Sequence, residues 1–216
     1  MSEEEYAKWQ LGDEKVAERI ALNSVSDEAI DTILKDRAYR INREAKLYGS
    51  EKTWGEFVAD PNNATRYDNL SEYLDGYERL IEKQSPWPDG YDKTKNIVTL
   101  KPGDEFYMVL DVDQKIPGGW GLKEEPTSVD FVRNYMAVKV AWKSDCGVVA
   151  KYKIKEGTYL DVPKGPVGPQ IDLVVNKYLP GSMNITQYDL FYQFGNTRVN
   201  RLDFIELVGG SYKLLK

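Results

Sequence analysis

The sequence contains no histidine, and this absence limits the catalytic schemes that its 216 residues can support. Histidine is the usual general base for serine and cysteine nucleophiles, a common metal ligand and a proton shuttle. The single cysteine, Cys146, lacks an imidazole partner, and we interpret it as a turn or core thiol. One cysteine forms no internal disulfide and no multi-cysteine metal site. Chemistry must therefore rely on carboxylates, amides, lysine, arginine, hydroxyls or bound water.

Carboxylates and lysines recur at even spacings, which places them on one face of a strand. Asp111 and Asp113 form such a pair, which could bind a divalent cation or split its pKa values. We favour a simpler interpretation, a strand end in water. Lysines also recur along two predicted strands, where they favour a sheet face that meets water. A shallow cationic cleft for an anionic substrate is the alternative. These lysines are Lys139, Lys143, Lys151, Lys153 and Lys155.

The overall charge argues against nucleic acid and anionic membrane as partners. The chain has 29 basic and 35 acidic side chains, a net charge of -6, whereas such partners call for a basic face. A local basic pocket remains compatible with this balance. No apolar run approaches the ~20 residues of a membrane-spanning helix. The acidic first ten residues lack the apolar core of a secretory signal.

The elements that must position these residues change in character near residue 84. Before it, apolar residues recur every three or four positions, which predicts helices. One helix is expected around Val16 and Ile20, and a second from residue 27 to 47, ending near Gly49. A loop is expected at residues 60–63. A third helix follows, with one apolar face formed by Leu70, Tyr73, Leu74, Tyr77, Leu80 and Ile81.

After residue 84 the pattern predicts strands. Residues 85–91 are rich in turn formers, and short β-branched and aromatic runs follow, separated by Gly/Pro turns. The fold class is therefore α+β, with a helical region at residues 1–84 and a compact β-rich domain at residues 85–216. We expect the domain to be a twisted antiparallel sheet or open barrel. The predicted strands are 97–100, 105–112, 137–142, 148–154, 157–162 and 201–207.

Three groups of segments in the β-rich part occur in a specific order. The first is Trp-Pro-Asp-Gly-Tyr at 87–91, followed by Leu-Lys-Pro-Gly at 100–103. The second is Gly-Gly-Trp at 118–120, with Pro-Thr-Ser at 126–128 and then Arg133. The third combines Tyr-Lys-Ile at 152–154, Gly-Pro-Val-Gly-Pro at 165–169 and Gly-Ser-Met-Asn-Ile-Thr-Gln-Tyr at 181–188. In this order, from Trp87 to Tyr212, they resemble the tuberculosis necrotizing toxin (TNT) family of NAD-cleaving enzymes.

The resemblance implies an NAD(P)+ glycohydrolase that releases nicotinamide and ADP-ribose, with NAD+ or NADP+ as substrate and no separate cofactor. It also implies a toxin or effector that leaves its cell by a specialised secretion system and acts in the cytoplasm of a target cell. The producing cell then needs protection, so the resemblance implies an immunity protein as a partner.

In the closing segment the resemblance assigns the catalytic role to Gln187, with Thr186 beside it as a substrate-binding residue. The N-glycosidic bond of NAD+ breaks through an oxocarbenium-like transition state, and nicotinamide is already a cationic leaving group. An amide that orients the ribose hydroxyls or the incoming water would therefore act by positioning. The alternative for Gln187 is a buried structural glutamine at a sheet edge.

Other substrate contacts follow from the same resemblance. It implies that Arg133 holds the dinucleotide phosphates, for which a forked guanidinium is well suited. The alternative is a surface arginine paired with Asp130. Trp120 would stack on nicotinamide or adenine, since a cationic ring favours an aromatic face. A core tryptophan under the sheet is the alternative.

Two positions depart from the family pattern. Ala150 stands where family members carry a histidine, and Lys115 is the cation available where they carry an arginine for substrate binding. Lysine can contact phosphate as a point charge but without bidentate geometry. Three possibilities therefore stay open: an active glycohydrolase, a related chemistry such as ADP-ribosyl transfer to a protein, and an inactive binding or structural domain of a phage or secreted assembly.

Overall fold

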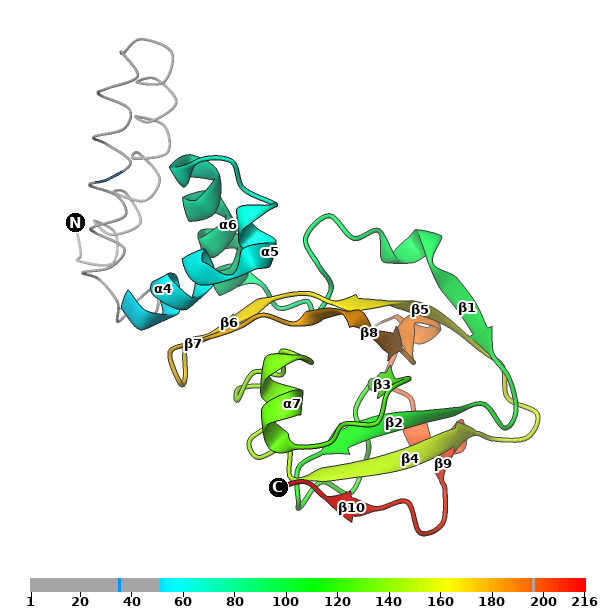
Figure 1. Ribbon diagram of the computed structural model, residues 1–216. Coiled ribbons are helices and arrows are strands. Elements are labelled where there is room, and N and C mark those ends of the chain that lie inside the picture. The colour runs from blue at the N-terminus through cyan, green and yellow to red at the C-terminus, as the bar shows by residue number, and fades with distance from the viewer. Residues whose placement is uncertain (1–34, 36–50, 196) are drawn as a thin grey trace, which may run out of the picture.

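The protein has an α+β fold in which helices precede an eight-stranded antiparallel open sheet (Figure 1). The computed structural model describes Lys35, residues 51–195 and residues 197–216. The helices expected around Val16 and over residues 27–47 lie outside the described residues. Within the described ranges, no helix is long and apolar enough to cross a membrane.

Residues 51–82 contain three helices, namely α4 (Glu51–Ala59), α5 (Pro61–Ala64) and α6 (Leu70–Glu82). The predicted apolar face of α6 is confirmed, and Asn69 caps its start by accepting a hydrogen bond from the Glu72 N–H at 3.0 Å. The loop expected at residues 60–63 is instead the short helix α5. Asp60 caps it, and Pro61 occupies its first turn, where a missing N–H costs nothing.

An aromatic cluster holds these helices on a hairpin of the β-rich part. Phe57 of α4 lies at its centre, 5.3 Å from the Tyr77 ring of α6 and 5.5 Å from the Tyr178 ring of β7 (centroid distances). The Tyr178 hydroxyl also donates to Asp60 at 2.8 Å. The helices and the hairpin therefore share one core, whereas the expected division at residue 84 stays a prediction.

The sheet has the strand order β1-β5-β8-β3-β2-β4-β10, with β9 also paired to β4, and every pair is antiparallel. A separate hairpin joins β6 to β7. The strands are β1 (Ile97–Leu100), β2 (Glu105–Leu110), β3 (Trp120–Leu122), β4 (Val148–Ile154), β5 (Leu160–Val167), β6 (Gln170–Asp172), β7 (Lys177–Leu179), β8 (Ser182–Asp189), β9 (Ile205–Leu207) and β10 (Lys213–Leu214).

Most predicted strands are confirmed in part or in full. Strands β1 and β4 match their predicted bounds, and β2 and β5 overlap theirs. Of the strand expected at 201–207 only β9 forms, because Arg201–Asp203 makes a 3-10 turn. The prediction missed β3, β6, β7, β8 and β10.

The strand expected at residues 137–142 is wrong, since this segment is irregular. Ala137 has a positive φ of 48°, which interrupts an extended chain. The backbone groups that follow bind side chains instead of a neighbouring strand. The Val138 carbonyl accepts from Arg133 at 2.9 Å, and the Val140 N–H donates to Asp172 at 2.6 Å. The segment therefore forms a folded loop beside the short helix α7 (Val129–Asn134).

Two apolar clusters occupy opposite faces of β2, as the alternation of a strand requires. Phe106, Met108 and Leu110 belong to one cluster, and Val109 belongs to the other. The second cluster includes Val132 of α7, so this helix covers that face of the sheet (Figure 1). The candidate site lies on the α7 face.

The expected lysine face holds for β4 only. Lys151 and Lys153 lie along this strand and pair with Glu105 and Glu206 at 3.1 and 3.0 Å. Lys139, by contrast, is buried and donates to the Lys83 carbonyl at 2.8 Å.

Candidate functional site

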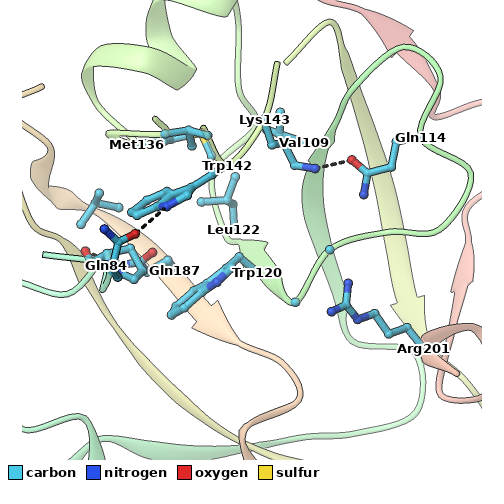
Figure 2. Close-up of a pocket in the computed structure, with 15 residues that line it drawn as sticks. Gln84, Val109, Gln114, Trp120, Leu122, Met136, Trp142, Lys143, Gln187 and Arg201 are labelled. Carbon is cyan, nitrogen blue, oxygen red and sulfur yellow. Dashed lines mark hydrogen bonds between the residues drawn. The ribbon is translucent and has the colours of Figure 1, made fainter. Parts of the chain in front are cut away.

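A cleft of about 450 Å³ opens on the α7 face of the sheet, within the range of small-molecule sites. Its floor is apolar and comes from side chains of the second core cluster. Residues of widely separated segments meet in it (Figure 2). The lining residues are Gln84, Pro86, Val109, Gln114, Gly118, Gly119, Trp120, Leu122, Met136, Val138, Trp142, Lys143, Val167, Gln187 and Arg201.

Residues 83–87, which we name the linker, form one wall of the cleft. They leave α6 and are held by side chains of the β-rich part. Gln170 donates to the Ser85 carbonyl at 2.7 Å, and Gln187 donates to the Pro86 carbonyl at 3.1 Å. The Trp142 ring N–H donates to the Gln84 side chain at 3.4 Å. The linker is therefore fixed by hydrogen bonds from β8, from the β6–β7 hairpin and from the irregular segment rather than by strand pairing.

Gln187 lies on β8 with only 4% of its surface exposed, and it lines the cleft. Its side-chain nitrogen donates to two backbone carbonyls, Pro86 at 3.1 Å and Pro166 at 2.9 Å. Carbonyl oxygens only accept, so the orientation of the amide is fixed. The side-chain oxygen accepts no hydrogen bond from the described part of the chain. It is the atom that Gln187 can offer to a hydroxyl or water in the cleft.

Two tryptophans lie on the same side of the cleft as Gln84 and Gln187 (Figure 2). Trp120 begins β3 and is 37% exposed, with its ring edge-on to Trp87 at 5.3 Å. Trp142 comes from the irregular segment that follows α7. Their rings give this end of the cleft an aromatic surface on which a planar ring can stack.

The opposite end of the cleft is cationic (Figure 2). Lys143 donates to the Gln114 side-chain oxygen, and burial lowers the pKa of its amine although Asp111 opposes that change. Arg201 donates to the Pro117 carbonyl at 2.6 Å and lies over the Phe191 ring, 5.6 Å from its centroid. A guanidinium suits phosphate or carboxylate oxygens. Since no aspartate or glutamate of the described residues lines the cleft, this end favours an anion.

Asp111 stands behind the cationic end and organises its loops. Its carboxylate accepts backbone N–H bonds from Ser144, Asp145 and Cys146 at 3.1, 3.0 and 2.9 Å. Asp111 is therefore a loop anchor rather than a strand end in water. The described residues contain no group of three potential metal ligands of the histidine, cysteine, aspartate or glutamate type.

The stability contributed by Asp111 is expected to depend on pH. Partial burial raises the pKa of its carboxyl, but the three N–H donors outweigh this and hold it below 3.8. A depressed folded-state pKa stabilises the fold above the ordinary value, and that stabilisation is lost as the pH falls through the folded pKa. Asp111→Asn should therefore lower the free energy of unfolding by about 1–2 kcal/mol at pH 7, and by less below pH 3.8.

Thermal unfolding at pH 7 and at pH 3 measures this difference. The exposed Asp113→Asn serves as the matched control and should change the melting temperature little at either pH. If Asp111→Asn lowered the melting temperature equally at both pH values, the anchoring role of the Asp111 carboxylate would be contradicted.

The other residues singled out in the sequence lie outside the cleft lining. The Arg133 guanidinium donates to the carbonyls of Val138, Lys143 and Ser144 at 2.9, 2.8 and 2.9 Å, so it fixes the irregular segment. Lys115 is exposed on the loop between β2 and β3. Thr186 precedes Gln187 on β8, so its side chain points to the opposite face. Substrate binding by these three residues stays a prediction.

Sequence reasoning missed Arg201, Trp142 and Gln84 as cleft residues. Arg201 follows a polar stretch with no motif, and Trp142 belongs to the segment that was predicted to be a strand. Lys143 belongs to the row of lysines for which the sequence favours a sheet face in water, with a cationic cleft as the alternative. The prolines that flank Trp87, Pro86 and Pro88, are a local signal that could have pointed to Gln84.

Cys146 is the buried core thiol that the sequence suggested. It is fully buried behind the cationic end, with a φ of 52°. Burial raises the pKa of its thiol to about 11, although the nearby Arg133 opposes this. The thiolate form is therefore scarce at neutral pH, which fits a packing role.

No protein-family model and no curated protein matches this sequence. Among solved structures, the chain is similar to a chain in the structure of Tne2 in complex with Tni2, with 16% sequence identity and a TM-score of 0.44. The similarity covers 60% of this chain and 97% of that chain, so this chain carries further residues that have no counterpart there.

Proposed function

We propose that the chain is an NAD(P)+ glycohydrolase of the toxin type and that the cleft around Gln187 is its active site. One observation carries the proposal. One cleft brings Gln187 and Trp120, both indicated by the TNT resemblance, together with two cations, and its described lining contains no carboxylate. The cations Lys143 and Arg201 were not part of that resemblance, yet they suit the diphosphate of the same substrate.

The cleft residues can be assigned to the parts of the reaction. The bond between ribose C1′ and the nicotinamide nitrogen breaks, and its electron pair leaves with nicotinamide. Water adds to C1′ and releases a proton, so that ADP-ribose is the second product. The Gln187 side-chain oxygen accepts from a ribose hydroxyl or from that water, which orients it. Trp120 and Trp142 stack on the nicotinamide ring, and Arg201 and Lys143 neutralise phosphate charge.

Incubation of the purified full chain with NAD+ or NADP+ tests this proposal, with the products separated by chromatography. Equal amounts of nicotinamide and free ADP-ribose are expected from NAD+, and equal amounts of nicotinamide and ADP-ribose 2′-phosphate from NADP+. ADP-ribose attached to protein would instead indicate transfer to a protein acceptor. Intact NAD+ and NADP+ after prolonged incubation would contradict the proposal.

A second candidate function is nucleotide binding without turnover. Among the residues that the structure describes, no carboxylate lines the cleft, and the chain has no histidine, so the described lining offers water no conventional general base. Under this alternative, NAD+ quenches the fluorescence of the cleft tryptophans in a saturable way while no nicotinamide is released.

An immunity protein and delivery into a target cell belong to the same proposal. Their support is the TNT resemblance, since a cell that makes an NAD-cleaving enzyme must protect its own NAD+. Expression of the chain in the cytoplasm of a bacterial host should therefore lower the NAD+ content and stop growth. The Gln187→Ala variant should not do so.

A further inference from the structure

We infer that the cleft recognises only the nicotinamide mononucleotide half of the dinucleotide, so that free nicotinamide mononucleotide is itself a substrate. This inference rests on the proposed function and narrows its substrate class. The polarity of the cleft, its size and the construction of its cationic end lead to it.

The cleft has one aromatic end and one cationic end. Trp120 and Trp142 lie on the side of Gln187, and Lys143 and Arg201 lie on the other side (Figure 2). A ligand whose nicotinamide ring lies on the tryptophans, with the adjoining ribose hydroxyls within reach of Gln187 at the same end, and whose 5′-phosphate lies at the cations would span the cleft. This order of base, ribose and phosphate is that of a mononucleotide.

Beyond the cations, the lining formed by the described residues offers no second aromatic surface for a base. The volume of about 450 Å³ lies in the lower half of the range for ligand clefts. Both tryptophans of the lining belong to the far end. The Arg201 guanidinium lies over the Phe191 ring, which packs against the first core cluster and does not line the cleft. An adenosine half would therefore extend over the outer surface.

The cationic end is built to hold a phosphate group. Arg201 uses one terminal nitrogen on Pro117, and its other terminal nitrogen lies beside Gly119, 3.9 Å from where a Cβ would stand. The backbone N–H groups of Gly118 and Gly119 bond to no described residue. A Cβ on Gly118 would meet open space, so the backbone is accessible. Guanidinium, ammonium and free N–H groups together match phosphate oxygens.

The reaction of the mononucleotide follows the same steps as that of NAD+. The C1′–nitrogen bond breaks with its electron pair going to nicotinamide, and water forms the new bond to C1′ and loses a proton. The products are nicotinamide, ribose 5-phosphate and a proton. No further reactant is needed.

The test compares nicotinamide release from NAD+, nicotinamide mononucleotide and nicotinamide riboside by the full chain. We expect kcat/KM for the mononucleotide to lie within about tenfold of that for NAD+. The riboside lacks the phosphate, so its kcat/KM should be about 100-fold lower than that of the mononucleotide. This is the loss expected for two charge-assisted hydrogen bonds.

Variants separate phosphate recognition from a structural role of Arg201. Arg201→Gln should reduce kcat/KM for the mononucleotide by about 10- to 100-fold and leave the riboside value almost unchanged. Arg198→Gln, which removes an exposed arginine outside the cleft lining, should change neither. If Arg201 had only a structural role, Arg201→Gln would lower kcat/KM for the mononucleotide and for the riboside by the same factor. That result would overturn the assignment of Arg201 to the phosphate.

The remaining outcomes distinguish this inference from the proposed function. If NAD+ is cleaved but kcat/KM for the mononucleotide is more than about 100-fold lower than for NAD+, the inference is overturned and the proposed function is intact. A difference of that size requires contacts between the protein and the adenosine half. If no substrate releases nicotinamide, the glycohydrolase proposal fails. Titration calorimetry then decides: a mononucleotide Kd within about tenfold of that of NAD+ supports the half-site, and no mononucleotide binding overturns it.

Discussion

Gln187→Ala is expected to reduce the rate of nicotinamide release from NAD+ by about 100- to 1,000-fold, the usual effect of losing one oriented polar group at a reacting centre. The change removes the side-chain oxygen that the wild-type residue presents to the cleft. It also removes the side-chain donor to the Pro86 and Pro166 carbonyls, although Pro86 keeps the Gly168 N–H at 2.8 Å, and this loss should cost about 1–3 kcal/mol of folding free energy. Steady-state kinetics and chemical denaturation measure the two effects separately.

Gln170 provides a matched control for the structural part of this effect. It is fully buried and donates to the Ser85 carbonyl at 2.7 Å, so it holds the same linker, but it does not line the cleft. Gln170→Ala should lose a similar amount of stability and keep kcat within about tenfold of the wild type. If both variants lost activity equally, Gln187 would act only by holding the linker, and its proposed contact with substrate would be wrong.

Phe57→Ala is expected to produce the largest loss of stability, about 3–5 kcal/mol of unfolding free energy. The Phe57 ring is fully buried at the centre of the aromatic cluster, with the rings of Tyr77 and Tyr178 at 5.3 and 5.5 Å. Its removal leaves a cavity between α4, α6 and the β6–β7 hairpin. Denaturation followed by circular dichroism measures the change.

Val58→Ala is the control for Phe57→Ala, because Val58 is the next residue in α4 and its side chain is 40% exposed. It should change the unfolding free energy by less than about 1 kcal/mol. Phe57→Ala also tests the predicted division at residue 84. If the helical region and the β-rich domain unfold independently, the variant should show two transitions. One cooperative transition at reduced denaturant would show that the shared core joins them.

The sequence predicted the elements that have strong periodicity and clean boundaries. The apolar face of α6 and the alternation of β4 each follow from one local pattern, and both are confirmed. Strand β8 was missed because its buried face carries Gln187, and a polar residue at such a position weakens the alternation. The burial of Gln187 depends on carbonyls of Pro86 and Pro166, which lie far away in the sequence.

The wrong strand at residues 137–142 has a related cause. Its β-branched and apolar residues favour extension, but Arg133 and Asp172 take up backbone groups that a strand would give to its neighbours. Tertiary contacts outweigh local propensity there. The same contacts bring Trp142 and Lys143 to the cleft. Arg201 arrives from near the C-terminus, so the cationic end could not be read from any local motif.

The most direct test of the central claim, that the cleft around Gln187 binds the nicotinamide end of NAD+, is a crystal structure. The ligand would be a carbocyclic NAD+ analogue whose glycosidic bond resists hydrolysis. We predict the nicotinamide ring against Trp120 and Trp142, the Gln187 side-chain oxygen within hydrogen-bond distance of a ribose hydroxyl, and phosphate oxygens at Arg201. A ligand bound away from Gln187, or one with its phosphates at the tryptophan end, would contradict the claim.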